Sequence, residues 1–137
     1  MPTLVECVPN FSEGRDESII RAITDAMVAV DGITLLDVDM GADFNRTVVT
    51  IVGPPESVLE AAINGTRIAL ERIDMSKHSG EHARMGAVDV VPFIPISGSS
   101  MSDCVELSIR YAETVSSEFG LPVYLYGESA RTDDRIR

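Results

Sequence analysis

Two histidines in one short segment are the residues whose type and spacing first suggest chemistry. His78 and His82 enclose a glutamate in the stretch SKHSGEHARMGAVD, which reads as the H-x-x-E-H pattern of some zinc hydrolases. That pattern binds one ion only when a helix brings both histidines to one face. Gly80 and Gly86 weaken such a helix, and no apolar stripe would dock it. Residues 75–87 are therefore predicted to form an irregular loop, with zinc as the weaker alternative.

A single imidazole in a loop fits a different chemistry. With an ordinary pKa of about 6.5, it can take and return a proton near neutral pH. The loop also gathers Lys77, His78, His82 and Arg84 in a chain that is otherwise acidic, and such a cationic spot suits an anionic substrate. A surface loop whose basic residues offset nearby acids explains the same composition.

The bulk composition limits the classes of protein to which the chain can belong. Its 137 residues, 45% hydrophobic and 24% charged, are typical of one globular domain. The net charge of −11 opposes binding to nucleic acid and to anionic lipid. Cys7 and Cys104 lie far apart without a CxxC motif, and the first residues show neither a signal peptide nor a membrane span. We therefore expect a cytoplasmic protein with no nucleic-acid partner and no membrane partner.

The spacing of apolar residues predicts strands and helices around one sheet. Strands are expected at residues 3–8, 33–40, 46–53, 88–96 and 122–127, and helices at residues 15–30, 54–73 and 102–119, the last capped by Ser102. Turn-prone residues join the second and third strands in an antiparallel hairpin, and two prolines place the fourth strand at a sheet edge. This order predicts an α+β, ferredoxin-like (split βαβ) sandwich, with a mixed, mainly antiparallel sheet and helices on one face.

Alternation along the second strand places two carboxylates on the face without helices. Leu36 and Val38 share one side of LLDVDM, whereas Asp37 and Asp39 share the other. Neighbouring carboxylates do not belong in a dry core, so their side should face solvent, a ligand or a second protein layer. Plain solvation of a half-exposed strand is an alternative explanation of this pattern.

Four segments occur in the order known from formiminotransferases: LVECVPNFSEG, LLDVD with NRTVVTIVGPPE, IDMSKHSGEHARMGAVDVVPFIPI, and PVYLYGESA. Over nearly all its length the chain resembles the N-terminal subdomain of the glutamate formimidoyltransferase family, which includes the transferase part of formimidoyltransferase-cyclodeaminase. The resemblance implies transfer of a formimino group from N-formimino-L-glutamate to N5 of tetrahydrofolate, in histidine catabolism and one-carbon metabolism. Tetrahydrofolate would be the co-substrate, and no metal is implied.

The resemblance also implies a catalytic pair. The family's catalytic histidine follows Gly-Glu and corresponds to His82, which would act as general base and then general acid. Asp39 matches an aspartate near that histidine and is expected to orient the imidazole, with Asp37 and Asp89 as weaker candidates. A turn-capping role before Gly41 is the structural alternative for Asp39.

Four further side chains are expected to bind substrate. Asn10, Asn45 and Arg46 fall at strand ends within the matched segments, where polar groups can meet a carboxylate or an amidine nitrogen. Arg84 could pair bidentately with a carboxylate. For the two asparagines, a role in turn formation is an equally good explanation.

Transferases that resemble this chain continue into a second, folate-binding subdomain whose sheet faces the first. Residues 1–137 are therefore expected to be the N-terminal subdomain alone. A second subdomain or another chain would be needed as a partner, and a homo-oligomer is expected. The net charge of −11 agrees, because it would repel both anionic substrates. The competing interpretation is a noncatalytic, stand-alone domain that acts in folate binding or subunit assembly.

Overall fold

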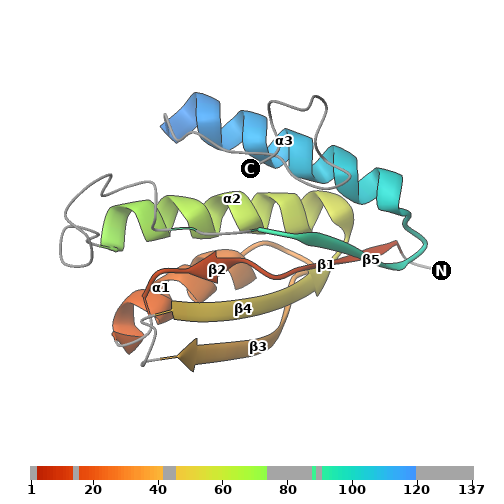
Figure 1. Ribbon diagram of the computed structural model, residues 1–137. Coiled ribbons are helices and arrows are strands. Elements are labelled where there is room, and N and C mark those ends of the chain that lie inside the picture. The colour runs from red at the N-terminus through yellow and green to blue at the C-terminus, as the bar shows by residue number, and fades with distance from the viewer. Residues whose placement is uncertain (1–2, 14–15, 42–45, 74–87, 89–90, 120–137) are drawn as a thin grey trace.

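The computed structural model describes residues 3–13, 16–41, 46–73, 88 and 91–119. Its elements in chain order are β1 (Leu4–Cys7), β2 (Asn10–Phe11), α1 (Glu17–Val28), β3 (Thr34–Gly41), β4 (Arg46–Gly53), α2 (Pro55–Arg72), β5 (Phe93–Ser97) and α3 (Met101–Phe119) (Figure 1). The strand expected at residues 122–127 and the loop expected at 75–87 lie outside the described residues.

Strand β4 lies at the centre of an antiparallel sheet. β3 pairs with one side of β4, while β1 and β2 pair in succession with the other side. β1 also pairs with β5, which gives the spatial order β3-β4-β1-β5. This order is that of a split βαβ, so the predicted ferredoxin-like fold is confirmed. The described pairs are antiparallel throughout, and β5 is an edge strand within the described part of the sheet, as its prolines predict.

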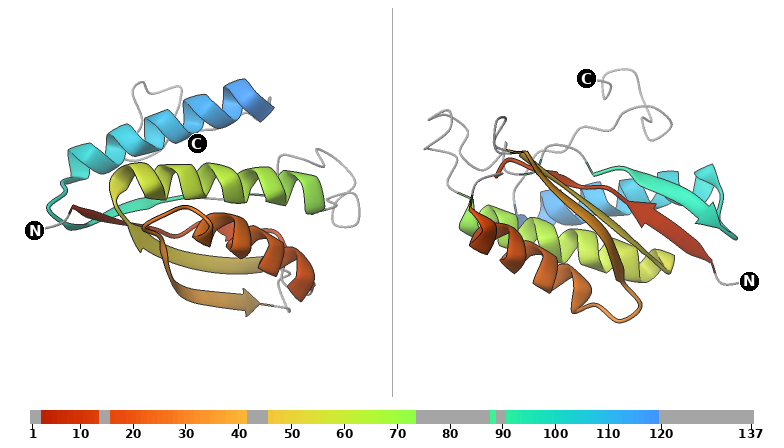
Figure 2. Two further views of the ribbon diagram at one scale, coloured as in Figure 1. Left: turned by 180° about the vertical axis from the view of Figure 1, so that it is seen from behind. Right: turned by 90° about the horizontal axis from the view of Figure 1, so that it is seen from below.

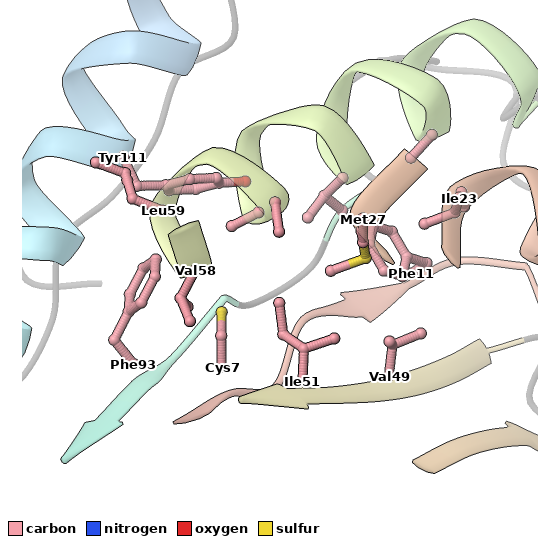
Figure 3. Close-up of a cluster of buried hydrophobic side chains, with 14 of the residues drawn as sticks. Cys7, Phe11, Ile23, Met27, Val49, Ile51, Val58, Leu59, Phe93 and Tyr111 are labelled. Atoms are coloured by element: carbon pink, nitrogen blue, oxygen red, sulfur yellow. The ribbon is translucent and has the colours of Figure 1, made fainter. Parts of the chain in front are cut away.

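Helices α1 and α2 cover one face of the sheet, with α3 beside α2 and β5 (Figures 1 and 2). Cys7, Val49 and Ile51 are fully buried, and Figure 3 shows their side chains pointing from the strands toward α2. α1 approaches α2 closely at Gly65, where an added Cβ would lie 3.0 Å from the Cγ and Sδ atoms of Met27. Gly65 therefore serves helix packing in the middle of α2, although glycine is a poor helix former.

The last described helix begins with a capping box. The backbone N–H of Ser100 donates to Asp103 Oδ2 over 2.9 Å, and the backbone N–H of Asp103 donates to Ser100 Oγ over 3.2 Å. The prediction that Ser102 caps this helix is therefore wrong, since Ser102 lies inside α3. The sequence Ser-x-x-Asp at 100–103 carried the signal for the correct cap.

A buried hydrogen-bond chain joins α3 to α2. Thr66 Oγ1 lies 2.8 Å from the carbonyl oxygen of Ala62 and 2.6 Å from the hydroxyl oxygen of Tyr111. Because Thr66 has one hydroxyl proton, which it gives to Ala62, the Tyr111 hydroxyl must be the donor to Thr66. The Tyr111 ring also meets the Phe93 ring edge to face, with centroids 6.1 Å apart.

At the surface, a second contact joins the same two helices. The two terminal nitrogens of Arg110 in α3 donate to the Glu56 carboxylate in α2 over 2.6 and 2.8 Å.

Two strands depart from their predicted form. The strand predicted at residues 3–8 ends at Cys7, and a short strand that was not predicted, β2, follows after Val8 and Pro9. Proline has no N–H to donate to the sheet, which explains the interruption. In β3, Leu35 pairs with Ile51 and Asp37 with Thr50, which leaves Leu36 as the extra residue of a bulge. Leu36 is 54% exposed and has no partner in β4, so the bulge interrupts the simple alternation that was expected to place Leu36 and Val38 on one side of the strand. None of the helices in the described part of the chain combines the length and the apolar composition that a membrane span requires.

Candidate active site on the open face of the sheet

The face of the sheet opposite the helices presents alternate residues of β4. Thr47, Val49 and Ile51 are fully buried toward the helices. The other side of the strand presents Arg46, Val48, Thr50 and Val52. We call this side, together with the residues that pair with these four, the open face. It is where a ligand or a second layer of protein can reach the strands.

Asn10 and Asp39 lie on the open face in one row. Asn10 pairs with Val48 from the β2 side, and Asp39 pairs with the same residue from the β3 side. Residues opposite one another in antiparallel strands point to the same face and have Cα atoms about 5 Å apart. The Cα atoms of Asn10 and Asp39 are therefore about 10 Å apart across Val48, a separation that substrate-sized groups can bridge.

Asp39 occupies a position within a strand, two residues before the end of β3 at Gly41. Its side chain is exposed, and so is that of Asp37, which pairs with Thr50 on the same face. The prediction that both carboxylates lie opposite the helices is confirmed. Asp39 is part of the ladder with β4, and residues 42–45, which the turn-capping alternative concerns, lie outside the described residues.

Asn10 also has a local structural role. Its Nδ2 atom donates to the carbonyl oxygen of Val8 over 3.1 Å, across the break at Pro9. The predicted role in turn formation is thus present. The bond uses the amide nitrogen of Asn10, and the side-chain carbonyl oxygen takes no part in it.

Arg46 marks one end of the same face. It is the first residue of β4, pairs with Gly41 and is exposed. Arg46 lies two positions before Val48, so the Cα atoms of Arg46 and Val48 are about 7 Å apart along the strand. The fold therefore brings Asn10, Asp39 and Arg46 together from three strands.

The remaining predicted site residues, His82, Asn45 and Arg84, lie outside the described residues, as does Asp89. One described position limits where this part of the chain returns to the sheet. Val88, six positions after His82 in the sequence, forms a bridge with Phe11, the neighbour of Asn10. The chain that follows His82 thus rejoins the sheet beside β2.

Metal binding is a separate question for this site. The described residues contain no group of three or more His, Cys, Asp or Glu side chains that could hold an ion. Both histidines lie outside those residues, so the zinc alternative stays untested.

Glu6 is a residue of the open face that the sequence reasoning did not single out. It pairs with Val52 on one side and Ile94 on the other, and it is half-buried between them. Its neighbours Val5 and Cys7 are fully buried on the helix side. The alternation in LVEC therefore held the signal, since two apolar residues that point inward leave the glutamate between them pointing outward.

Charge is unevenly distributed over the described part of the open face. Glu6, Asp37 and Asp39 are its carboxylates, and they follow β4 from Val52 to Val48. Arg46 supplies a cation at the other end of the strand. A ligand lying along β4 would thus meet a guanidinium at one end and carboxylates over the rest.

Comparison with known sequences identifies the family. Residues 4–137 match the model of the formiminotransferase domain, N-terminal subdomain. The chain belongs to this family. It is 54% identical to a formimidoyltransferase-cyclodeaminase of Sus scrofa over 98% of its own length and 25% of that relative.

Shorter transferases match over a similar stretch of this formiminotransferase subdomain. The glutamate formimidoyltransferase of Streptococcus pyogenes serotype M1 is 45% identical over 98% of the chain and 45% of the relative. That of Thermoplasma acidophilum is 47% identical over 97% of the chain and 44% of the relative. The chain thus spans about a quarter of the two-function relatives and less than half of the transferases.

Proposed function

We propose that this subdomain is the catalytic half of a glutamate formimidoyltransferase, which transfers a formimino group from N-formimino-L-glutamate to N5 of tetrahydrofolate. The observation that carries the proposal is the gathering of Asn10, Asp39 and Arg46 on one open sheet face. This gathering occurs in a chain whose relatives are named glutamate formimidoyltransferases. A second subdomain or another chain would supply the rest of the folate surface.

The reaction needs one group that both accepts and returns a proton. The N5 amine attacks the formimino carbon and must lose its proton, and the glutamate nitrogen must gain one as its bond to that carbon breaks. A positioned imidazole can perform both steps, a role worth about 10²–10⁴-fold in rate. We assign it to His82.

Asp39 would orient that imidazole. A carboxylate that accepts the N–H of one ring nitrogen fixes the tautomer and stabilises the imidazolium. The bridge between Val88 and Phe11 supports a contact between His82 and Asp39. Phe11 follows Asn10 in β2, and Asn10 lies in the same row as Asp39, so the chain after His82 rejoins the sheet close to that row. The six residues from His82 to Val88 can span at most about 20 Å.

Arg46 and Asn10 would hold the formimino donor. A guanidinium binds a carboxylate through two parallel hydrogen bonds, and the donor is a dicarboxylate. Arg46 lies about 7 Å along β4 from the Val48 row, a distance suited to a donor whose carboxylates are held at one end while its formimino carbon reaches Asp39 and Asn10. The side-chain carbonyl oxygen of Asn10 could accept from an amidine nitrogen, with Asn45 and Arg84 adding further contacts.

The test is a transfer assay on the full-length protein that contains this subdomain. Formation of the folate product from N-formimino-L-glutamate and tetrahydrofolate would be measured for the parent protein, His82→Ala and His78→Ala. The second histidine is a matched control, because it lies in the same segment and has the same chemistry. We expect His82→Ala to lower kcat by about 10²–10⁴-fold and His78→Ala to change it little.

Each other outcome supports a different interpretation. A parent protein that binds folate without turnover would support the noncatalytic alternative and contradict ours. Loss of activity in both variants, together with loss of one bound zinc per chain by elemental analysis, would support the zinc alternative.

A further inference from the structure

We propose that Glu6 binds the pyrimidine edge of the pterin ring and so positions tetrahydrofolate at one end of the open face. The inference rests on the proposed function, because it names the residue that would position the second substrate. Glu6 would be a binding residue, whereas proton transfer would remain with His82.

The position of Glu6 carries the inference. It lies in the middle of β1 and is flanked by Val52 of β4 and Ile94 of β5 in one row across the sheet. Ile94 is 37% exposed and Val52 is half-buried, so the carboxylate stands between two apolar side chains that a ligand could cover. Covering them would remove water from the carboxylate and strengthen each hydrogen bond that it accepts.

The chemistry of a pterin matches this setting. The edge of its pyrimidinone ring presents two adjacent donors, the N3–H and the 2-amino group, and an ionised carboxylate can accept from both at once. The flat ring would at the same time cover apolar surface at Val52 and Ile94. A dicarboxylate donor has the opposite properties, since its anionic groups would be repelled by Glu6.

The order of residues along β4 supplies the second argument. Arg46 and Val52 are six residues apart, which corresponds to about 20 Å of strand, and the Val48 row lies between them. The formimino donor would enter from the Arg46 end, because a cation is present there. The pterin would enter from the Glu6 end, and the two reacting atoms would meet near Asp39 and Asn10. One sheet face would thus separate the two substrates by charge.

The test measures folate affinity in the full-length protein. Dissociation constants for tetrahydrofolate would be determined under anaerobic conditions for the parent protein, Glu6→Gln and Glu60→Gln. Glutamine keeps the shape of Glu6 but replaces one acceptor by a donor that faces a donor of the pterin. Glu60 is an exposed residue of α2, so its variant controls for the change in net charge.

We expect Glu6→Gln to weaken tetrahydrofolate binding by about 10- to 100-fold, the range for hydrogen bonds to a charged group. The KM for N-formimino-L-glutamate should stay unchanged, which a general loss of structure would not allow. Glu60→Gln should bind like the parent protein.

A ligand change would separate direct contact from an indirect effect. A tetrahydrofolate analogue with methyl in place of the 2-amino group should bind the parent protein as poorly as Glu6→Gln binds the natural folate. Glu6→Gln should bind this analogue only slightly more weakly than it binds tetrahydrofolate, because the contact between Glu6 and the 2-amino group is already absent in the variant.

The outcomes distinguish this inference from the proposed function. If the parent protein binds folate and Glu6→Gln binds it equally well, Glu6 has no role in pterin binding and the proposed reaction still stands. Additive losses from the Glu6 variant and the analogue would likewise overturn the contact. A full-length parent protein that binds no folate would overturn both proposals.

Discussion

Asn10 and Asp39 pair with the same residue, Val48, from opposite sides, and so lie in one row across the open face of the sheet. They are far apart in the sequence and come from different strands. The row exists because β4 lies between β3 and the interrupted strand formed by β1 and β2. Antiparallel pairing then gives both side chains the same direction as Val48.

The position of Asp39 predicts a pH effect. In the full-length protein we expect Asp39→Asn to lower kcat/KM at least tenfold, because the imidazole of His82 would lose its orienting carboxylate. A neighbouring carboxylate stabilises the imidazolium and raises its pKa, so its removal should lower that pKa. The acidic limb of the pH profile of kcat/KM should therefore move to lower pH.

Asp37→Asn is the matched control for this experiment, since Asp37 is exposed on the same face and pairs with Thr50, one row away. It should leave the acidic limb in place. A shift of that limb in Asp37→Asn but not in Asp39→Asn would assign the orienting role to Asp37 instead.

The hydrogen bond between Thr66 and Tyr111 predicts an asymmetry in stability. In Tyr111→Phe, the Thr66 hydroxyl still donates to Ala62, so we expect a loss of about 1 kcal/mol in the free energy of unfolding. In Thr66→Val, the buried Tyr111 hydroxyl loses its acceptor, and the expected cost is about 1–3 kcal/mol. Urea denaturation of the two single variants and the double variant would measure these values.

The double variant is the internal control for that pair. It should cost less than the sum of the two single losses, because both variants remove the same bond. Additive losses would show that the bond contributes nothing beyond the packing of the two side chains.

The capping box at the start of α3 predicts a difference between two nearby serines. Ser100→Ala removes the oxygen that accepts from the Asp103 N–H, and it should lower the free energy of unfolding by about 1 kcal/mol. Ser102→Ala should be neutral or slightly stabilising, because Ser102 is exposed within the helix and alanine is the better helix former. Thermal unfolding of both variants would check this. The reverse order would mean that Ser102 is the cap in solution.

The two cysteines predict a loss of stability at high pH. Cys7 and Cys104 are 0% and 1% exposed, and burial raises the pKa of both thiols above the ordinary value. Burial likewise raises the pKa of the Tyr111 hydroxyl. Above about pH 8.5 the unfolded chain releases thiol protons that the folded chain keeps. The free energy of unfolding should be undiminished below that pH and should fall as the pH rises further.

Urea midpoints at pH 7.5 and 9.5 would measure this fall, and Cys7→Ala should reduce it. A thiol reagent at pH 8 should also label the native protein far more slowly than the urea-unfolded protein. Rapid labelling of both cysteines in the native state would contradict the buried thiols.

Much of the fold could be predicted from local patterns. Apolar spacing located α1, α2 and α3, and the hairpin of β3 and β4 followed from two strand-like runs around a turn-prone segment. Strand alternation was enough to place Asp37 and Asp39 opposite the helices. These features depend on neighbours in sequence, which is why one sequence reveals them.

Other features depended on contacts between distant residues. The bulge that exposes Leu36 arises from the register of β3 against β4, which no local pattern shows. A glycine is required at position 65 of α2 because Met27 of α1 packs against it, and this contact is between two different helices. The Ser100 cap had a local signal in Ser-x-x-Asp, which the prediction of a Ser102 cap overlooked, and the hydrogen bonds identify Ser100 as the cap.

For the site, the sequence by itself determined the residue types, the family resemblance and the side of β3 on which Asp39 lies. Only the tertiary structure decided that Asn10 and Asp39 flank one valine, that Arg46 marks one end of their face, and that Glu6 lies in the row of Val52. The physical reason is that side chains in a sheet become neighbours through the hydrogen-bonded register between strands. Register is set by the packing of the whole sheet against its helices.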